Sequence, residues 1–192
     1  MPEPLDVVVV VGSLRAGSWN RRVGQLLAVR APSGVSVELV ELRDIPPYDN
    51  DLELEGEPAA VADFKTRLAA ADGVIISTPQ YNAGISGVVK NALDWASRPL
   101  FAGPLADKPA TIVAASPSRN EPLRAAAQAR ETTWACGAKL APEPDLTIAG
   151  VGHHVDEETG EFDAETSGRA EAFMATFVEF IRTSAAAAEE VA

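Results

Sequence analysis

The sequence predicts an α/β fold in which a five-stranded parallel sheet lies between two layers of helices. Two observations predict it. Strand-like and helix-like segments alternate along the chain, and parallel strands require such helical crossovers. The first apolar run, Leu5–Val11 (LDVVVVV), is continuously β-branched, which is typical of a strand covered on both faces. A chain of 192 residues can bury the core of one such domain, so we expect residues 1–192 to form a single domain.

The elements of the first half follow from local signals, taken in chain order. Gly12 ends the first strand. A helix from about Ser18 stops before Pro32, because the residue before a proline disfavours helical geometry. A second strand follows at Val35–Leu42. The next segment, 43–58 (RDIPPYDNDLELEGEP), is rich in proline and acid and lacks periodicity, so we expect a surface loop without regular structure.

The second half repeats the alternation. Pro58 suits a first helical turn, and Gly137 suits the residue that follows a helix. The strands expected here are Asp72–Ser77, Lys108–Ser116 and Asp145–Ala149, and the helices are Pro58–Ala70, Val88–Ser97, Leu123–Cys136 and Glu165–Thr183. From about residue 184 the tail SAAAAEEVA is expected to fray. Right-handed crossovers then favour a flavodoxin-like three-layer sandwich with strand order 2-1-3-4-5.

Composition restricts the classes of function. The chain has 16 basic and 28 acidic side chains, a formal charge of −12, so we expect neither nucleic acid nor a membrane as a partner. No apolar run reaches the ~18 residues of a membrane span. The start, MPEPLD, lacks the basic region of a signal peptide. The single cysteine, Cys136, has no internal disulfide partner, which fits a cytoplasmic location.

In this fold, ligands bind outside the carboxyl ends of the strands, where the loops beginning at Gly12, Thr78 and Ser116 should gather. The first loop reads GSLRAGSWN. Its glycine allows a sharp turn, and Ser13, Ser18 and Asn20 are short polar side chains that can donate to phosphate oxygens.

Arg15 adds a charged fork to this loop, and the helix that begins here presents free N–H groups to an anion. We therefore predict a phosphate site. The alternative is a plain strand-to-helix turn in which Ser18 or Asn20 caps the helix.

The second loop, 78–87 (TPQYNAGISG), places an aromatic residue and an amide at the same edge. A flat, partly polar ring could lie against this backbone and meet its N–H groups. The alternative is a surface loop in which Tyr81 packs down onto the protein.

Together the two loops resemble the NADPH-dependent FMN reductases, flavodoxin-like flavoproteins that include quinone, chromate and azo-dye reductases. The first loop matches the phosphate motif GSxRxxSxN of that family. The stretch from Pro79 to Trp95 (PQYNAGISGVVKNALDW) is similar to its second signature, PEYNxGxPGxLKNAxDW. The resemblance spans about residues 5 to 148.

The resemblance implies a site for FMN. In it, Ser13, Arg15, Ser18 and Asn20 bind the FMN phosphate. The residues that line the isoalloxazine ring, mainly through backbone groups, are Pro79, Gln80, Tyr81, Asn82 and Gly84. Ser116 opens a third loop that closes over the other side of the ring. Lys90 to Trp95 would lie near a dimer or tetramer contact, although a core helix explains Leu93 and Trp95 equally well.

The function so implied is hydride transfer from NADPH or NADH through FMN to a small acceptor: free flavin, a quinone, an azo compound or chromate. The scheme is ping-pong, and no side chain is required as a catalytic acid or base. This agrees with the absence of His and Cys from all three loops.

Three departures from the family pattern keep an alternative open. Gln80 stands where the family often has Glu, and Ser86 stands where it usually has Pro. The third loop, Ser116 to Pro122, lacks the usual glycines, and Ala126-Ala127-Gln128 replaces R-A-Q. Arg119 could meet a cofactor phosphate or be a solvated charge. The alternative function is an FMN-binding electron-transfer or flavin-carrier protein that does not oxidise NADPH itself.

Other candidate groups are interpreted as structural. Cys136 is expected to be a small buried hydrophobe. His153 and His154, near Asp156 and Glu157, lack the spacing of metal ligands, so we expect a solvated loop and no metal site. Asp49 and Asp51 are expected to solvate their loop and not to act as acid or base.

Overall fold

The computed structural model describes residues 3–189, and these form a six-stranded parallel sheet between two helical layers. The strand order is β2-β1-β3-β4-β5, with β6 also paired to β4. The strands are β1 (Leu5–Val11), β2 (Val35–Glu41), β3 (Gly73–Thr78), β4 (Pro109–Ala115), β5 (Lys139–Leu140) and β6 (Leu146–Ile148). The predicted order 2-1-3-4-5 is thus confirmed. The predicted fifth strand is the observed β6, because the two-residue β5 is too short to produce a recognisable pattern.

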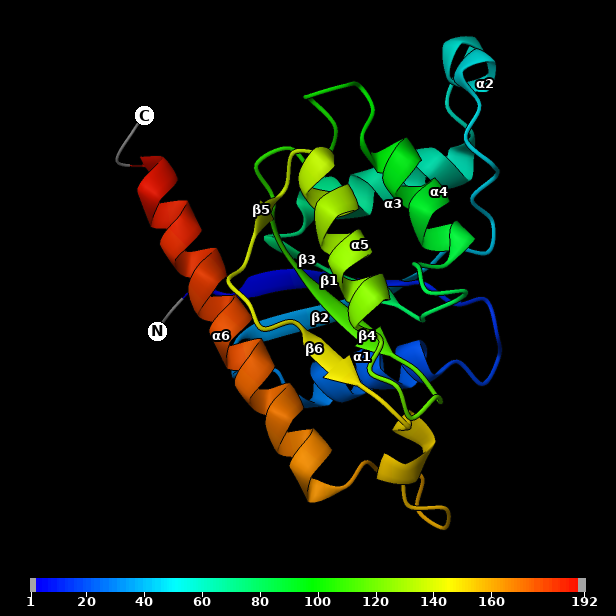
Figure 1. Ribbon diagram of the computed structural model, residues 1–192. Helices are drawn as coiled ribbons and strands as arrows, with labels where there is room; N and C mark the ends of the chain where they lie inside the picture. The colour runs from blue at the N-terminus through cyan, green and yellow to red at the C-terminus, as the bar shows by residue number, and fades with distance from the viewer. Residues whose placement is uncertain (1–2, 190–192) are drawn as a thin grey trace.

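Seven helical segments connect and cover the strands in the described part of the chain. They are α1 (Trp19–Arg30), α2 (Asn50–Glu55), α3 (Ala59–Ala70), α4 (Gly87–Ala96), α5 (Leu123–Ala135), the 3-10 helix η1 (Val151–His154) and α6 (Ala164–Glu189). Helices α3, α4 and α5 cover one face of the sheet, and α1 and α6 cover the other (Figure 1).

Two predictions about irregular segments are corrected. The expected loop 43–58 contains α2, whose first turn is capped by Asp49: its carboxylate accepts from the Asp51 N–H at 2.9 Å. None of the residues of α2 is buried, so it has no apolar stripe that could have revealed it. Helix α6 continues to Glu189, past the predicted end at Thr183, because alanine is the strongest helix former. Residues 190–192 of the tail lie outside the described residues.

The interpretation of β1 as a strand covered on both faces is confirmed. Val8 and Val10 belong to the core cluster beneath α3, α4 and α5, whereas Val7, Val9 and Val11 belong to the cluster beneath α1 and α6. No helix within residues 3–189 is both long and apolar enough to cross a membrane.

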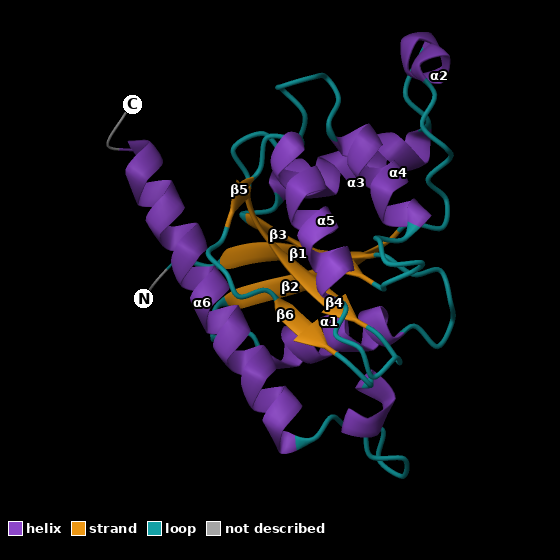
Figure 2. Ribbon diagram, viewed as in Figure 1, coloured by secondary structure: helices purple, strands orange, loops and turns teal. Residues whose placement is uncertain are grey.

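Strand register brings the three loops of interest to one edge. Val11 is the partner of Ser77, and Thr78 is the partner of Ala114. The chain therefore leaves β1, β3 and β4 at nearly the same level, on the side to which the strand arrows point in Figure 2.

Candidate functional site

Gly12 presses the first loop onto its neighbours. Its N–H donates to Ser77 O at 2.7 Å, and its carbonyl accepts from Ser86 Oγ at 2.7 Å. A Cβ built at Gly12 would lie 2.4 Å from Val89 Cγ2 and 2.5 Å from Ser77 O. Close approach, and not a positive φ, is therefore what requires glycine here.

Ser86, the departure from the family's Pro, joins the first two loops. It is buried and caps α4, with its Oγ accepting from the Val89 N–H at 3.4 Å while donating to Gly12 O. The hydroxyl thus supplies a bond between the loops that a proline could not make.

Ser18 is the N-cap of α1. Its Oγ accepts from the Arg21 N–H at 3.2 Å, and the side chain is buried against the loop. Capping uses the oxygen as an acceptor, which leaves the hydroxyl proton free to donate to an anion. Ser13 is also buried, one residue after the glycine. The capping alternative is confirmed for Ser18, and it is compatible with a phosphate at the same helix end.

Arg15 differs from the other basic residues of this loop. Arg21 forms an ion pair with Glu41 at 2.6 Å. Arg22 stacks 4.7 Å from the centroid of the Trp19 ring and donates to Gly160 O at 2.6 Å. Arg15 is exposed, and its guanidinium makes no hydrogen bond or ion pair within residues 3–189. Its charge is therefore the one that an incoming anion can use.

Asn20 lies beneath the loop. Its Nδ2 donates to Ala115 O at 3.1 Å, and its Oδ1 accepts from the Ala115 N–H and from Ser77 Oγ, each at 3.2 Å. The side chain is almost completely buried. The structure therefore uses Asn20 to tie α1 to β3 and β4 beneath the loop.

A residue not foreseen from the sequence supports the same loop. The Arg43 Nη2 donates to Leu14 O at 2.5 Å and brings a second positive charge close to Arg15. Arg43 follows β2, the neighbour of β1, so the predicted strand order contained the signal that could have found it.

The second loop is a tight turn with a fixed backbone. Tyr81 and Gly84 exchange N–H···O bonds of 2.9 and 3.0 Å, and the two residues between them, Asn82 and Ala83, have φ of +50° and +65°. These are the features of a type I′ turn, which holds its peptide groups in one orientation. Tyr81 is 49% exposed, so it does not pack down into the core, while Pro79 is buried.

Two glutamines attach this turn to α5. Gln80 Oε1 accepts from the Ala125 N–H at 3.2 Å, and Gln128 Oε1 accepts from the Ile85 N–H at 2.9 Å. A Cβ at Gly84 would lie 2.6 Å from Gln128 Oε1, so glycine permits this contact. A glutamate at position 80 could accept the same bond, which makes Gln80 a mild departure.

The third loop is held by polar contacts where the family has glycines. Ser116 is buried; its Oγ accepts from the Ser118 N–H at 3.2 Å, and its N–H donates to Ile148 O at 3.0 Å. Ser118 O accepts from the Gly150 N–H at 2.6 Å. A cavity of about 540 Å³ opens between the second and third loops, lined by Gln80, Ala83, Asn120, Glu121, Leu123 and Arg124. Arg119 is exposed on this loop.

The signature helix α4 is a core element that anchors another loop. Asn91 Nδ2 and Trp95 Nε1 donate to Pro46 O at 2.8 and 2.9 Å, and Asn91 Oδ1 accepts from the Tyr48 N–H at 2.7 Å. Leu93 and Trp95 are fully buried, so the core-helix alternative is confirmed for both.

The remaining candidate groups lie outside these loops. Burial raises the pKa of Cys136 to about 11, so its thiol stays protonated at neutral pH and behaves as the expected hydrophobe. His154 Nδ1 lies 3.0 Å from Asp163 Oδ2. Among residues 3–189, no three His, Cys, Asp or Glu side chains gather as a metal site would require.

Comparison with known proteins agrees with this geometry. The family model described as NADPH-dependent FMN reductase matches residues 5–152. An NAD(P)H-dependent FMN reductase from Pseudomonas aeruginosa is 36% identical over 158 residues, covering 82% of this chain and 85% of that protein. A quinone reductase from Escherichia coli is 37% identical over 185 residues, covering 95% and 98%.

Among solved structures, FerB, a flavoenzyme NAD(P)H:(acceptor) oxidoreductase from Paracoccus denitrificans, superimposes with a TM-score of 0.85 at 29% identity. It covers 94% of this chain and 98% of its own. Both loops lie at one sheet edge, and the family model matches residues 5–152 of the 192 in this chain, so this chain belongs to the NADPH-dependent FMN reductase family.

Proposed function

We propose that this chain is an FMN-dependent oxidoreductase that passes hydride from NADPH or NADH to a small acceptor in a ping-pong reaction. The observation that carries the proposal is the first loop. An unpaired, exposed Arg15 lies beside the capped start of α1, in a chain whose formal charge is −12. A local positive site on an acidic protein is best explained by a bound anion, and the FMN phosphate is the anion that the family binds.

The phosphate would be held by Ser13, Arg15, Ser18 and the first N–H groups of α1, with Arg43 adding charge. Asn20 stays in the proposal as the residue that fixes α1 under the loop. The Ser18 hydroxyl and the Arg15 guanidinium would both donate to the charged phosphate oxygens, and such charge-assisted hydrogen bonds are stronger than neutral ones.

The isoalloxazine ring would lie along the second loop, against Pro79, Gln80, Tyr81, Asn82 and Gly84, with Ser116 opening the opposite side. The type I′ turn and the bond from Ile85 to Gln128 keep these backbone groups preorganised. When bound, FMN supplies the chemistry of accepting and donating hydride. The chain supplies orientation and charge, and none of the three loops contains a His or Cys that could act as acid or base.

Quinones are the acceptor class that we favour. Relatives that this chain matches over most of its length are named quinone reductases. The cavity between Ala83 and Leu123 offers a flat acceptor an approach to the proposed ring position. The carrier alternative is not favoured, because these relatives are named as reductases.

We also propose that the chain forms a homodimer or homotetramer and acts in the cytoplasm. Leu100, Phe101 and Trp134 expose 57%, 84% and 68% of their surface, and large exposed apolar side chains are typical of contacts between subunits. Size-exclusion chromatography with light scattering tests the assembly directly: a monomer at micromolar concentration would contradict it.

The function is tested by recording the flavin spectrum of the purified protein and then adding NADPH without oxygen. We expect rapid bleaching of the flavin bands, followed by recovery when a quinone is added. Bound flavin that NADPH does not bleach would indicate the carrier function instead. A protein that takes up no FMN would refute the proposal.

A further inference from the structure

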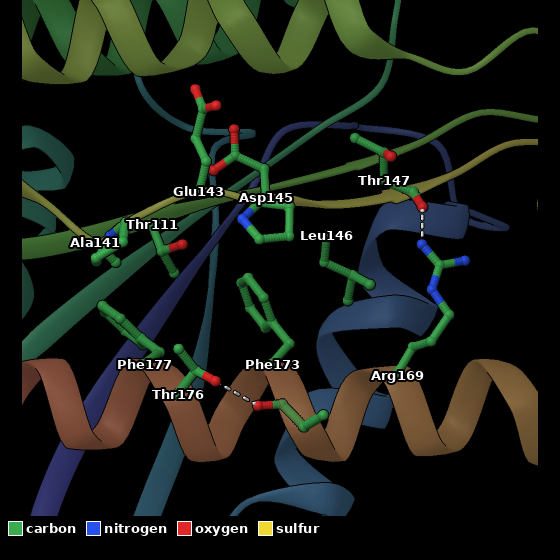
Figure 3. A pocket seen from close by; sticks show the side chains of 13 residues that line it. Thr111, Ala141, Glu143, Asp145, Leu146, Thr147, Arg169, Phe173, Thr176 and Phe177 are labelled. Atoms are coloured by element: carbon green, nitrogen blue, oxygen red, sulfur yellow. Dashed lines mark hydrogen bonds between the residues drawn. The ribbon is translucent and has the colours of Figure 1, made fainter.

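A second cavity lies on the other side of the sheet, between α6 and the segment 141–147 (Figure 3). Its volume is about 420 Å³. It exists because the edge partner of β4 is interrupted: β5 pairs with Pro109 and Ala110, and β6 pairs only from Val113 onward. Between these strands the chain carries Pro142 and Pro144, which have no N–H to donate to the sheet.

The interruption is held open by a partly buried ion pair. The Asp145 carboxylate lies 2.7 Å from Arg130 Nη1, and the Arg130 Nη2 donates to Ala141 O at 2.9 Å. Arg130 therefore fixes both ends of the bulging segment on the α5 side. The segment cannot collapse onto α6 without breaking these bonds.

The walls of the cavity are mostly apolar. Phe173 and Phe177 face it from α6, and Leu146 faces it from the opposite side (Figure 3). Pro142 and Pro144 also line it. Small-molecule sites typically combine such walls with a few polar groups, in volumes of about 300–1,000 Å³. This cavity falls within that range.

Thr111 is the polar group at the base of the cavity. The residue is only 2% exposed, and its Oγ1, which makes no side-chain hydrogen bond within residues 3–189, is not among the fully enclosed unpartnered atoms and so borders the cavity. Figure 3 shows the Thr111 side chain at the cavity wall. Of the two other threonines that line the cavity, Thr147 and Thr176, the Thr176 hydroxyl is already engaged: its Oγ1 donates to Ala172 O at 3.0 Å. Because the Thr111 hydroxyl borders the cavity and has no partner from the protein, it is available to bond a polar group that enters there.

We propose that this cavity is a second small-molecule site, which binds an uncharged aromatic compound of one or two rings carrying a hydroxyl or carbonyl group. The size follows from the volume, since an apolar cavity of roughly 150 Å³ already holds benzene. The polar substituent follows from Thr111, which can donate or accept one hydrogen bond.

The charged residues at the edge of the cavity favour an uncharged ligand. Glu143 lies there, and the Arg169 Nη2 is engaged by Thr147 O at 2.7 Å. An anion would meet a carboxylate on a chain whose formal charge is −12. A cation would have to compete with Arg130 for Asp145, so a neutral ring fits best.

The site is separate from the proposed flavin site and does not depend on the proposed function. Thr111 precedes Ser116 by five residues along β4, which is roughly 16 Å at the rise of a parallel strand. A ligand here would contact α6 and not the loops that hold the flavin.

The test is titration of the purified protein with 1-naphthol by isothermal calorimetry, with and without saturating FMN. We expect one binding site per chain, with an affinity for 1-naphthol that FMN does not change. Thr111→Val should lower this affinity by about twofold to tenfold, as the loss of one neutral hydrogen bond predicts. Thr111→Ser keeps the hydroxyl and should retain the affinity within about twofold.

Ala172 lines the cavity from an exposed position of α6, so Ala172→Phe should fill the space and abolish binding while leaving the fold intact. The thermal transition of each variant checks folding, and the two Thr111 variants decide the question if Ala172→Phe unfolds. Absence of binding at millimolar naphthol would overturn the proposal. So would binding that FMN displaces, or binding that Thr111→Val and a folded Ala172→Phe both leave unchanged.

Discussion

Replacement of Arg15 by alanine tests the phosphate site most directly. The side chain is exposed, and its guanidinium makes no hydrogen bond or ion pair within residues 3–189, so its removal should not disturb the fold. A hydrogen bond to a charged group contributes about 1.5–3 kcal/mol. The dissociation constant for FMN should therefore rise by roughly 10- to 150-fold, since each 1.4 kcal/mol is tenfold.

The assay is titration of FMN against the apoprotein, followed by the quenching of flavin fluorescence. Because Arg15 is exposed, the loss should shrink as salt screens the charge, and Arg15→Lys should give an intermediate value because it retains charge without the planar fork.

Arg30→Ala is the matched control. Arg30 is exposed in the last turn of α1, so the variant removes the same charge at the far end of the same helix. Unchanged affinity in Arg15→Ala would refute the phosphate assignment. An equal loss in both variants would show that overall charge, and not the loop, determines FMN affinity.

Three further predictions follow from the contacts described above. Gly12→Ala should lower the free energy of unfolding by about 1–3 kcal/mol in urea denaturation, because its Cβ would lie 2.4 Å from Val89 Cγ2; Gly17→Ala, with nothing within 4 Å, should change it little. Gln128→Leu, which leaves the Ile85 N–H without its acceptor, should weaken FMN by about threefold to tenfold in the same fluorescence titration, whereas Gln128→Glu should not; equal behaviour would contradict the role of α5 in holding the turn. Cys136 should resist thiol reagents at pH 8 until the protein unfolds. Burial raises the pKa of Cys136 in the folded state to about 11, above the ~8.5 of the unfolded chain. The contribution of this thiol to the free energy of unfolding should therefore be fully present below pH ~8.5 and fall as the pH rises toward 11. Cys136→Ala should reduce this loss when denaturation is measured across that pH range.

Much of the fold could be predicted because its signals are local. The valine run of β1, the prolines that bound the first and third helices, and the alternation of strands and helices all depend on neighbouring residues. Strand order followed from the right-handed rule for crossovers, which then placed Gly12, Thr78 and Ser116 at one edge. The sequence did not reveal the short elements α2 and β5, because α2 has no buried residue and β5 has only two residues.

The candidate site was predicted in its outline but not in the direction of its side chains. Ser18 and Asn20 look alike in the motif, yet Ser18 caps the helix in the loop while Asn20 turns inward to Ala115. Gln128 and Arg43 lie 44 and 29 residues from the loop residues Gly84 and Leu14, and no local pattern links them.

The sequence by itself determined the strands, the helices, their order and the two loops that identify the family, because periodicity, turn residues and motif spacing are encoded by neighbours. Only the tertiary structure decided which polar groups of those loops are consumed by the fold and which stay free for a ligand. It also created the cavity at Thr111, because a gap in strand pairing and the helix that covers it come from segments far apart in the chain.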